Sequence, residues 1–321
     1  MTDRRTGRGR PSAEAAEAGR DAAVAMAGVE LTHPGRVLYA DQGLTKLDLA
    51  RHYVSVSDLM MPLLSRRPLT LVRCPQGRQA ACFYQKHTDD AFPKTVRRVR
   101  IQEKAGRVKE YAYVTSLAGV LALVNIGTLE LHTWGAHVDR VERPDRLVFD
   151  LDPDPDVSWG AVCETALHVR DRLAQLGLRS FAKTTGGKGL HVVVPLLRRA
   201  DWEQTAAFAR AFAKSIEADA PDRYTTDVAK AKRKDRILID YLRNTRGATA
   251  VEAYSTRARR GAPVATPVRW EEVGPSLRPD RYNVGNFGER LRALAGADPW
   301  AGYREARQPL SAAVLRSLNI S

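Results

Sequence analysis

Large apolar residues recur at helical spacing in the first part of the chain. After Thr45 they follow at intervals of three or four as far as Pro68, namely Leu49, Tyr53, Val56, Met60 and Leu63. Thr45 and Asp48 have the residue types and spacing of a helix-starting cap pair. The pattern therefore predicts a helix that begins after Thr45 and ends before Pro68.

Short β-branched and apolar runs alternate with helical patterns through the rest of the chain. Strands are predicted at 69–72, 108–114, 128–134, 146–152, 178–183, 190–194 and 236–241. Helices are predicted at 116–125, 158–176, 202–218 and 289–295. Because the two types alternate irregularly and several strands are joined by tight loops, the chain is predicted to have an α+β fold with largely antiparallel sheets.

The two ends of the chain differ from the middle. Residues 1–27 are rich in Ala, Arg, Gly and Glu and hold almost no large apolar side chains, which predicts a disordered tail. Residues 28–300 carry the periodic patterns of one folded domain. Residues 301–321 are predicted to be a C-terminal extension or tail.

Composition narrows the class of protein. Of the 321 residues 44% are hydrophobic, enough for a packed core, and the net charge of +14 indicates a polyanionic partner. The longest apolar run, Leu117–Ile126, is about half of the ~20 residues that a membrane crossing needs. Cys74, Cys82 and Cys163 can form no disulfide framework and lack zinc spacing, so a reducing compartment and no structural metal are expected. We expect a cytoplasmic protein that meets nucleic acid.

Two carboxylates stand two residues apart on one predicted strand. Side chains alternate across a strand, so Asp150 and Asp152 point to one face while Phe149 and Leu151 point to the other. Such paired charges favour a divalent cation with oxygen ligands, although a solvated loop is the alternative for an isolated Asp-x-Asp. Asp154 and Asp156 alternate with prolines and are interpreted as surface turn residues.

A third carboxylate, Asp240, ends another apolar strand directly after a basic run. Alone, such a residue is more often a strand end that faces water. Together with Asp150 and Asp152 it could hold two ions ~3.5–4 Å apart, the spacing used for in-line phosphoryl transfer.

A glycine-rich loop supplies a candidate phosphate site. The loop 184–189 contains three glycines, two threonines and Lys188. It is no P-loop, because a strand follows where a helix should begin, and a flexible hairpin turn is the alternative. His132 and His191 are interpreted from the residues alone as structural, and Phe83 with Tyr84 as a base-stacking pair or as core. Basic residues concentrate at 93–110 and 221–260, which suits a nucleic-acid backbone or a solvated face.

Four of these segments, in this order, resemble a known family. Residues 147–153, 184–191, 239–241 and 253–257 are similar to the polymerase domain of bacterial ATP-dependent DNA ligase D, a member of the archaeo-eukaryotic primase superfamily that serves non-homologous end joining. The likeness extends from about Leu31 to Trp300. It implies the primase fold, with antiparallel sheets that carry the catalytic carboxylates and helices at their flanks.

The resemblance also implies roles for individual residues. The catalytic metal-binding carboxylates would be Asp150, Asp152 and Asp240. The incoming triphosphate would be held by His132, Thr185, Lys188 and Arg257. The DNA-binding residues would be Phe83, Tyr84 and Arg73 near the templating base, with Arg36 and Lys46 around a 5′-phosphate.

The implied activity is template-dependent nucleotidyl transfer to a 3′-hydroxyl at DNA breaks or short gaps. Two divalent ions, Mn²⁺ or Mg²⁺, would act with NTP or dNTP substrates, ribonucleotides being preferred. The partners would be DNA with 5′-phosphorylated gaps or 3′ overhangs, Ku and an ATP-dependent DNA ligase, at the nucleoid of a bacterial cytoplasm. Thr185 stands where relatives often have Ser, and Arg36 replaces a common Lys.

Two other functions are compatible with parts of the pattern. The segment 148–152 also imitates the aspartyl nucleophile of a haloacid-dehalogenase-type phosphatase, which would need a parallel sheet and a later acidic pair. A basic, non-catalytic nucleic-acid-binding module would need none of the three aspartates. The chain has no Lys-x-Asp-Gly motif of a ligase, so we expect a free-standing polymerase or one excised from a longer protein.

Overall fold

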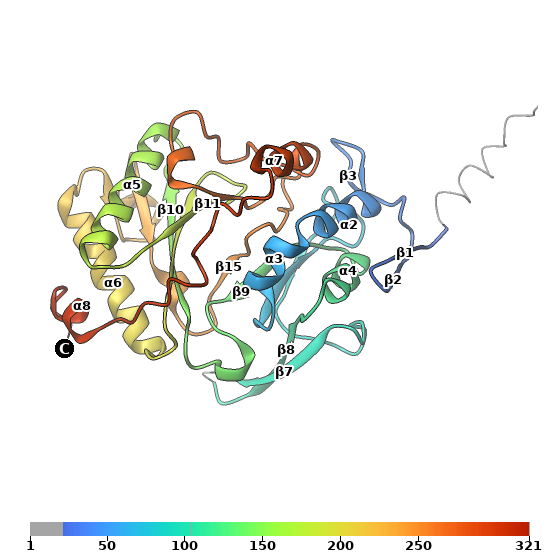
Figure 1. The fold of residues 1–321 in the computed structure, drawn as a ribbon, viewed down its shortest axis with the longest axis horizontal. Coiled ribbons are helices and arrows are strands. Elements are labelled where there is room, and N and C mark those ends of the chain that lie inside the picture. The colour runs from blue at the N-terminus through green and yellow to red at the C-terminus, as the bar shows by residue number, and fades with distance from the viewer. Residues whose placement is uncertain (1–21, 104, 321) are drawn as a thin grey trace, which may run out of the picture.

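Two β-sheets carry the core of the protein in this computed structural model, which describes residues 22–103 and 105–320 (Figure 1). One sheet has six strands in the order β13-β14-β10-β12-β11-β16, and the other has four in the order β15-β9-β5-β6. Apart from the parallel pair β13 and β14, the ladders between these strands are antiparallel. The predicted α+β fold with largely antiparallel sheets is confirmed.

The strand bounds follow the order of each sheet. The six-stranded sheet consists of β13 (Tyr224–Thr225), β14 (Ile237–Asp240), β10 (Arg146–Pro153), β12 (Leu190–Pro195), β11 (Phe181–Thr184) and β16 (Pro267–Val268). The four-stranded sheet consists of β15 (Thr249–Val251), β9 (Thr128–Trp134), β5 (Leu69–Arg73) and β6 (Phe83–Gln85). Three separate pairs are β1 (Val24–Met26) with β2 (Val29–Leu31), β3 (Val37–Tyr39) with β4 (Leu44–Thr45), and β7 (Arg97–Gln102) with β8 (Val108–Tyr113).

Helices cover the outer faces of the sheets. The helices are α2 (Lys46–Ser55), α3 (Ser57–Leu64), α4 (Leu117–Asn125), α5 (Trp159–Gln175), α6 (Trp202–Asp219), α7 (Phe287–Leu294) and α8 (Ala312–Arg316). Helices α5 and α6 lie against the six-stranded sheet, and α2, α3 and α4 belong to the core around the four-stranded sheet (Figure 1). Within the described part of the chain, no helix is both long and apolar enough to span a membrane.

Alternate side chains of β10 belong to two different hydrophobic cores, one on each face of the six-stranded sheet. Leu147, Phe149 and Leu151 are buried with residues of α5 and α6, whereas Val148 is buried with residues of the four-stranded sheet. Since side chains at every second position share a face, Asp150 and Asp152 point to the side of Val148. The prediction that both carboxylates leave the apolar face of this strand is confirmed.

The predicted helix after Thr45 is present, but it is split. Thr45 and Asp48 form a capping box, in which each side chain accepts a hydrogen bond from the backbone N–H of the other residue. Val56, with φ −106° and ψ 4°, leaves helical geometry and divides α2 from α3. Apolar spacing alone did not reveal this break, because the buried face continues through both helices.

Secondary structure and packing extend into the described parts of both predicted tails. Residues 1–21 lie outside the described part, but β1 starts at Val24 and pairs with β2 through a turn at Ala27 and Gly28, both of positive φ. Beyond Trp300, Tyr303 is buried and Gln308 hydrogen-bonds the carbonyls of Arg179 and Pro195. Residues 301–320 therefore lie against the body of the protein.

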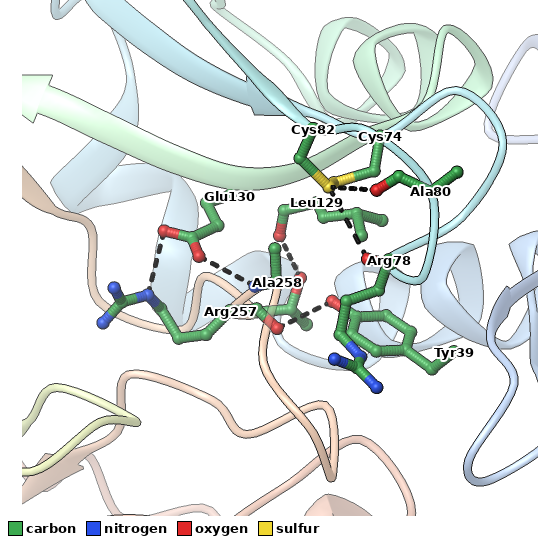
Figure 2. Close-up of a disulfide and its surroundings, with 10 residues drawn as sticks. Tyr39, Cys74, Arg78, Ala80, Cys82, Leu129, Glu130, Arg257 and Ala258 are labelled. Carbon is green, nitrogen blue, oxygen red and sulfur yellow. Dashed lines mark hydrogen bonds and ion pairs between the residues drawn. A yellow bond between two sulfur atoms is a disulfide. The ribbon is translucent and has the colours of Figure 1, made fainter.

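The three cysteines form no disulfide framework, but two of them form a single bridge that the sequence analysis did not predict (Figure 2). Cys74 and Cys82 are bridged, with their Cα atoms 4.4 Å apart, while Cys163 is free and buried. The reason is strand register: Arg73 lies opposite Phe83 in the β5–β6 ladder, so the next rung of the hairpin brings the two cysteines face to face. Spacing along the chain does not disclose such a register.

Buried polar contacts join the two sheets. Arg146 on β10 pairs with Glu252, which follows β15, at 2.9 Å between Nη2 and Oε2, and both side chains are almost fully buried. Thr133 on β9 donates its hydroxyl to the same carboxylate at 2.6 Å. Lys183 on β11 donates to the carbonyl of Val251 at 2.7 Å. These contacts fix how the sheets face each other.

We predict that replacing one partner of the buried Arg146–Glu252 pair lowers stability more than replacing both partners. Arg146→Met leaves the Glu252 charge buried and should lower the free energy of unfolding by about 3–5 kcal/mol, whereas Arg146→Met with Glu252→Leu should lose clearly less. The measurement is urea denaturation. Arg223→Met, which breaks an exposed pair with Glu164, is the control and should cost at most about 1 kcal/mol. A loss in Arg146→Met no larger than this control would contradict the prediction.

We predict that Lys183 makes stability depend on pH. Burial lowers the pKa of Lys183 to about 7 from its ordinary 10.5. Between these values the unfolded chain binds a proton that the folded chain does not, so the free energy of unfolding should rise with pH by up to about 1.4 kcal/mol per unit. Lys183→Met should lose this contribution, whereas Lys109→Met, at an exposed site, should keep the wild-type slope in denaturation between pH 7 and 10. A wild-type slope in Lys183→Met would refute the assignment.

Candidate active site

Four ionisable residues form a row across neighbouring strands of the six-stranded sheet. Asp150 on β10 lies opposite Asp240 on β14 and, on its other side, opposite His191 on β12. His191 in turn lies opposite Lys183 on β11. Directly opposed residues share a face, so all four point to the side of the sheet that also carries Asp152. The three predicted carboxylates are thus brought together.

The facing carboxylates repel each other in a poorly solvated place. Burial raises the pKa of Asp240, and the charges of Asp150 and Asp152 raise it further, although Arg243 acts in the opposite direction. Burial also opposes the ionisation of Asp150, but contact with His191 and the charge of Arg243 hold its pKa well below the usual range. The site therefore concentrates negative charge that a cation would stabilise.

Basic side chains stand between the carboxylates. Arg243 is 3.4 Å from a carboxylate oxygen of both Asp150 and Asp240. Lys188 Nζ is 3.1 Å from Asp152 Oδ1, and Arg233 contacts the other oxygen of Asp152. In the described ranges the three aspartates do not form a group whose ligand atoms all lie within 4.8 Å of one another.

The donor set nevertheless suits a divalent metal ion. Its three carboxylates are the hard oxygen ligands that Mg²⁺ and Mn²⁺ prefer. His191 is buried, its Nε2 is 3.4 Å from Asp150 Oδ1, and its Nδ1 has no hydrogen-bond partner within the described chain. Burial and the charge of Lys183 lower its pKa to about 4, so the ring is neutral at pH 7. A neutral imidazole beside Asp150 leaves the carboxylate charge available to a cation.

A second acidic group lies nearby at the surface. The carboxylates of Asp154, Asp156 and Asp235 come within 4.8 Å of one another, and Asp156 and Asp235 are exposed. This agrees with the interpretation of Asp154 and Asp156 as turn residues. Exposed acidic groups of this kind are common without an ion, and none of the three carries the buried, opposed geometry of the row.

The glycine-rich loop folds tightly against β10. Thr185 closes it, because its hydroxyl donates to the carbonyl of Gly189 at 3.1 Å. A Cβ at Gly189 would lie 2.3 Å from the carbonyl oxygen of Leu151, and Gly186 has a φ of +63°, so both positions require glycine. Lys188 donates to the carbonyl of Pro153 at 2.8 Å. The loop thereby holds its lysine beside the carboxylates.

Glu130 on β9 organises the residues predicted to hold a triphosphate. Its carboxylate binds Arg257 Nε at 2.9 Å and accepts the backbone N–H of Ala258 at 2.8 Å (Figure 2). It also binds His132 Nε2 at 2.7 Å. Burial opposes ionisation of Glu130, yet these bonds hold its pKa at about 2. Arg257 also donates to the carbonyl of Thr185 and so ties the four-stranded sheet to the loop.

These groups surround one cleft of about 320 Å³ between the two sheets. Of the predicted site residues, those that line it are Tyr84, His132, Asp150, Asp152, Thr185, Lys188 and Arg257. Asp240 reaches the cleft through Arg243, which also lines it. The carboxylates, Lys188 and the Thr185 hydroxyl on the side of the six-stranded sheet, with His132 and Arg257 across the cleft, suit a metal-bound polyphosphate.

The predicted DNA-binding residues lie outside this cleft, apart from Tyr84. Tyr84 is 75% exposed and Phe83 44% exposed, which rules out their interpretation as core. The guanidinium of Arg73 stands 5.4 Å from the Phe83 ring centroid and donates to the carbonyl of Ile126. The aromatic pair thus forms an exposed edge beside the cleft.

Arg36 and Lys46 come together at the end of α4. The Lys46 ammonium is buried and donates to the carbonyls of Thr32 and Asn125 at 2.7 and 3.1 Å. Burial, with the nearby charge of Arg36, lowers its pKa to about 8. Arg36 is half-buried and donates to the carbonyl of Pro75. Lys46 therefore satisfies a helix C-terminus, where cations are favoured, and Arg36 is the more accessible of the pair.

Sequence reasoning missed several residues of the site. These are Glu130, Lys183, His191, Arg233, Arg243 and Arg259. The residues alone gave His191 only a structural role, and the arginines were counted within the basic stretch 221–260. One signal was available for Glu130, Lys183 and His191, since each is a charged or titratable residue inside an apolar strand. Arg233 carried no local signal, because its partner Asp152 lies 81 residues away, and Arg243 has a second partner, Asp150, at a separation of 93 residues besides its neighbour Asp240.

Comparison with known proteins gives the same family by three routes. Residues 45–300 match the family model of the LigD primase-polymerase domain. Curated relatives include the multifunctional non-homologous end joining protein LigD of Pseudomonas aeruginosa, 39% identical over 92% of this chain, and that of Mycolicibacterium smegmatis, 31% identical over 87%. This chain spans 35% and 38% of their lengths.

A solved structure agrees with the family assignment. The polymerase domain of Mycobacterium tuberculosis ligase D in complex with DNA superposes with a TM-score of 0.79 at 28% identity, covering 88% of this chain and 99% of that one. Because the matched family is a primase-polymerase domain, and primases and polymerases are nucleotidyltransferases, the predicted enzyme class is confirmed at the level of the family. With a matching family model over most of its length and relatives at this identity, the chain belongs to the LigD primase-polymerase domain family.

Proposed function

We propose that this chain is a template-dependent nucleotidyltransferase that extends a 3′-hydroxyl at DNA breaks or short gaps with nucleoside triphosphates, ribonucleotides being preferred. The single observation that carries the proposal is the cross-strand pair Asp150–Asp240, with Asp152 on the same face. Opposed, half-buried carboxylates destabilise a sheet unless they bind a cation. They stand beside a cleft whose other wall is basic.

The three aspartates would hold two divalent ions, Mg²⁺ or Mn²⁺. When bound, such ions activate the attacking oxygen and neutralise charge on the leaving pyrophosphate. The chain itself positions the triphosphate: Lys188 and Arg257 offer charge, and the Thr185 hydroxyl and His132 offer hydrogen bonds. Glu130 orients His132 and Arg257, so both present fixed geometry to the substrate.

DNA would approach along the exposed edge that begins at Tyr84. Tyr84 and Phe83 offer faces for stacking a base, and Arg73 beside Phe83 adds a cation. Arg36 and Lys46 would meet a 5′-phosphate at a gap. A net charge of +14 favours association with DNA in general, and the physiological partners would include Ku and a ligase.

The alternative functions are less well supported. A haloacid-dehalogenase-type phosphatase needs its nucleophile in a parallel sheet, whereas both neighbours of β10 are antiparallel to it. A non-catalytic binding module gives no reason for facing carboxylates in a buried sheet. Binding of DNA that is indifferent to nucleotide and to all three aspartates would favour that module.

We predict that the carboxylate row is essential and the surface acidic group is not. Asp152→Asn and Asp240→Asn should each reduce primer extension by at least about 100-fold, because each would remove a metal ligand worth several kcal/mol. Asp156→Asn, in the neighbouring turn, is the matched control and should remain active. The assay compares rNTP with dNTP, and Mg²⁺ with Mn²⁺, on gapped and blunt DNA. Primer extension retained by Asp152→Asn would contradict the role of the carboxylate row. Equal use of dNTP and rNTP would contradict the preference for ribonucleotides.

We predict that Arg36 gives a preference for a 5′-phosphate. Wild-type protein should bind gapped DNA more tightly when the downstream strand is phosphorylated, and Arg36→Ala should lose about 1–2 kcal/mol of that preference, because a charge-assisted contact to phosphate disappears. Arg51→Ala, an exposed arginine on α2, should keep it. Equal affinity of wild-type protein for both DNAs, measured by fluorescence anisotropy, would remove the 5′-phosphate site but not the polymerase proposal.

A further inference from the structure

A cavity of about 930 Å³ lies at the other end of the strands that carry the carboxylates. Asp145, immediately before β10, and Pro195, at the end of β12, line it, whereas Asp150 and His191 of the same strands belong to the catalytic row. Five residues of strand separate Asp145 from Asp150, which is about 16 Å. The end of α3 and the segment after Trp300 complete its walls. No residue lines both this cavity and the candidate active-site cleft.

The lining of this cavity is strongly basic. It contains seven arginines and His137 against three acidic residues, Asp139, Asp145 and Glu305. Two arginines are already paired, Arg67 with Asp145 and Arg198 with Asp139. The other five have no carboxylate within ion-pair distance in the described ranges; they are Arg66, Arg140, Arg199, Arg304 and Arg307.

Two buried side chains, Arg67 and Tyr303, form part of the cavity wall. Arg67 is only 3% exposed and is held by two bonds of 2.6 and 2.7 Å to Asp145 and one of 2.7 Å to the carbonyl of Leu63. Tyr303 is buried at 8% exposure, and its hydroxyl has no hydrogen-bond partner in the described part of the chain. A buried hydroxyl without a partner is costly, and a ligand that accepts its hydrogen bond would relieve that cost.

We propose that this cavity is a second binding site for phosphate groups, separate from the catalytic cleft. Guanidinium groups bind phosphate oxygens in a two-pronged geometry, and five of the arginines that line this cavity have no carboxylate within ion-pair distance in the described ranges. Tyr303 also lines the cavity, and its hydroxyl, which has no hydrogen-bond partner in the described part of the chain, can donate to a ligand. Because Tyr303 is the one large aromatic side chain in the lining and it is buried, the cavity recognises phosphates rather than the faces of bases.

Two sources could bring such phosphates, a strand of nucleic acid or a free polyphosphate. The test is arginine footprinting with phenylglyoxal on the intact chain, read for each arginine by mass spectrometry. The probes are a single-stranded DNA oligonucleotide, inorganic tripolyphosphate, and polyglutamate as an anion without phosphate. We expect Arg199, Arg304 and Arg307 to react severalfold more slowly with the oligonucleotide, with tripolyphosphate or with both, and the effective probe identifies the source.

Charge-matched variants supply the second measurement. If the source is a strand, the slope of log K against log salt for the oligonucleotide should fall by about 1.4 in Arg199→Ala/Arg304→Ala, because each lost phosphate contact on single strands is worth about 0.7. If the source is tripolyphosphate, that variant should lose its affinity for it. Arg278→Ala/Arg292→Ala removes two exposed arginines that line neither site and should behave as wild type.

Unchanged modification rates with both phosphate probes would overturn the proposal, and so would equal protection by polyglutamate. Equal losses in the two double variants would also overturn it, because they would show that net charge alone is responsible. Neither measurement uses primer extension. A negative result for this cavity therefore does not bear on the proposed polymerase function, and a negative primer-extension result does not bear on this cavity.

Discussion

The repulsion between Asp150 and Asp240 is the interaction on which the site depends. Two carboxylates face each other on adjacent strands of a sheet whose other face is packed with aliphatic and aromatic side chains. Such an arrangement lowers the stability of the folded protein and brings no structural benefit of its own. The surrounding cations Arg243, Lys188 and Arg233 reduce that cost, because each lies within ion-pair distance of one of the aspartates.

The contacts between the sheets then explain why the opposite wall of the cleft is rigid. Arg146 with Glu252, and Lys183 with the carbonyl of Val251, fix the spacing of the two sheets from inside. Glu130 does the same at the mouth of the cleft by holding His132 and Arg257. A phosphate chain that enters between the walls meets donors that need little reorganisation, which is the condition under which hydrogen bonds contribute most to catalysis.

Much of this site was predictable from the sequence, and the parts that were not share one cause. Alternation on β10 predicted a common face for Asp150 and Asp152, and the glycines of the loop predicted a close backbone approach. Strand register is not written in local sequence, so the Cys74–Cys82 bridge and the row through His191 could not be derived. Tertiary contacts also gave Lys46 a buried role at a helix end that its motif did not show.

The bridge between Cys74 and Cys82 has a consequence for the exposed ring of Tyr84. Strand β6 is three residues long and lies at the edge of its sheet, where a ladder of this length frays easily. The covalent tie one residue before Phe83 shortens the free loop and restricts how far the strand can peel away. With the bridge intact, the aromatic edge is held by a covalent bond as well as by the three residue pairs of the ladder. After reduction only the ladder remains, so the position of the Tyr84 ring should be less firmly defined.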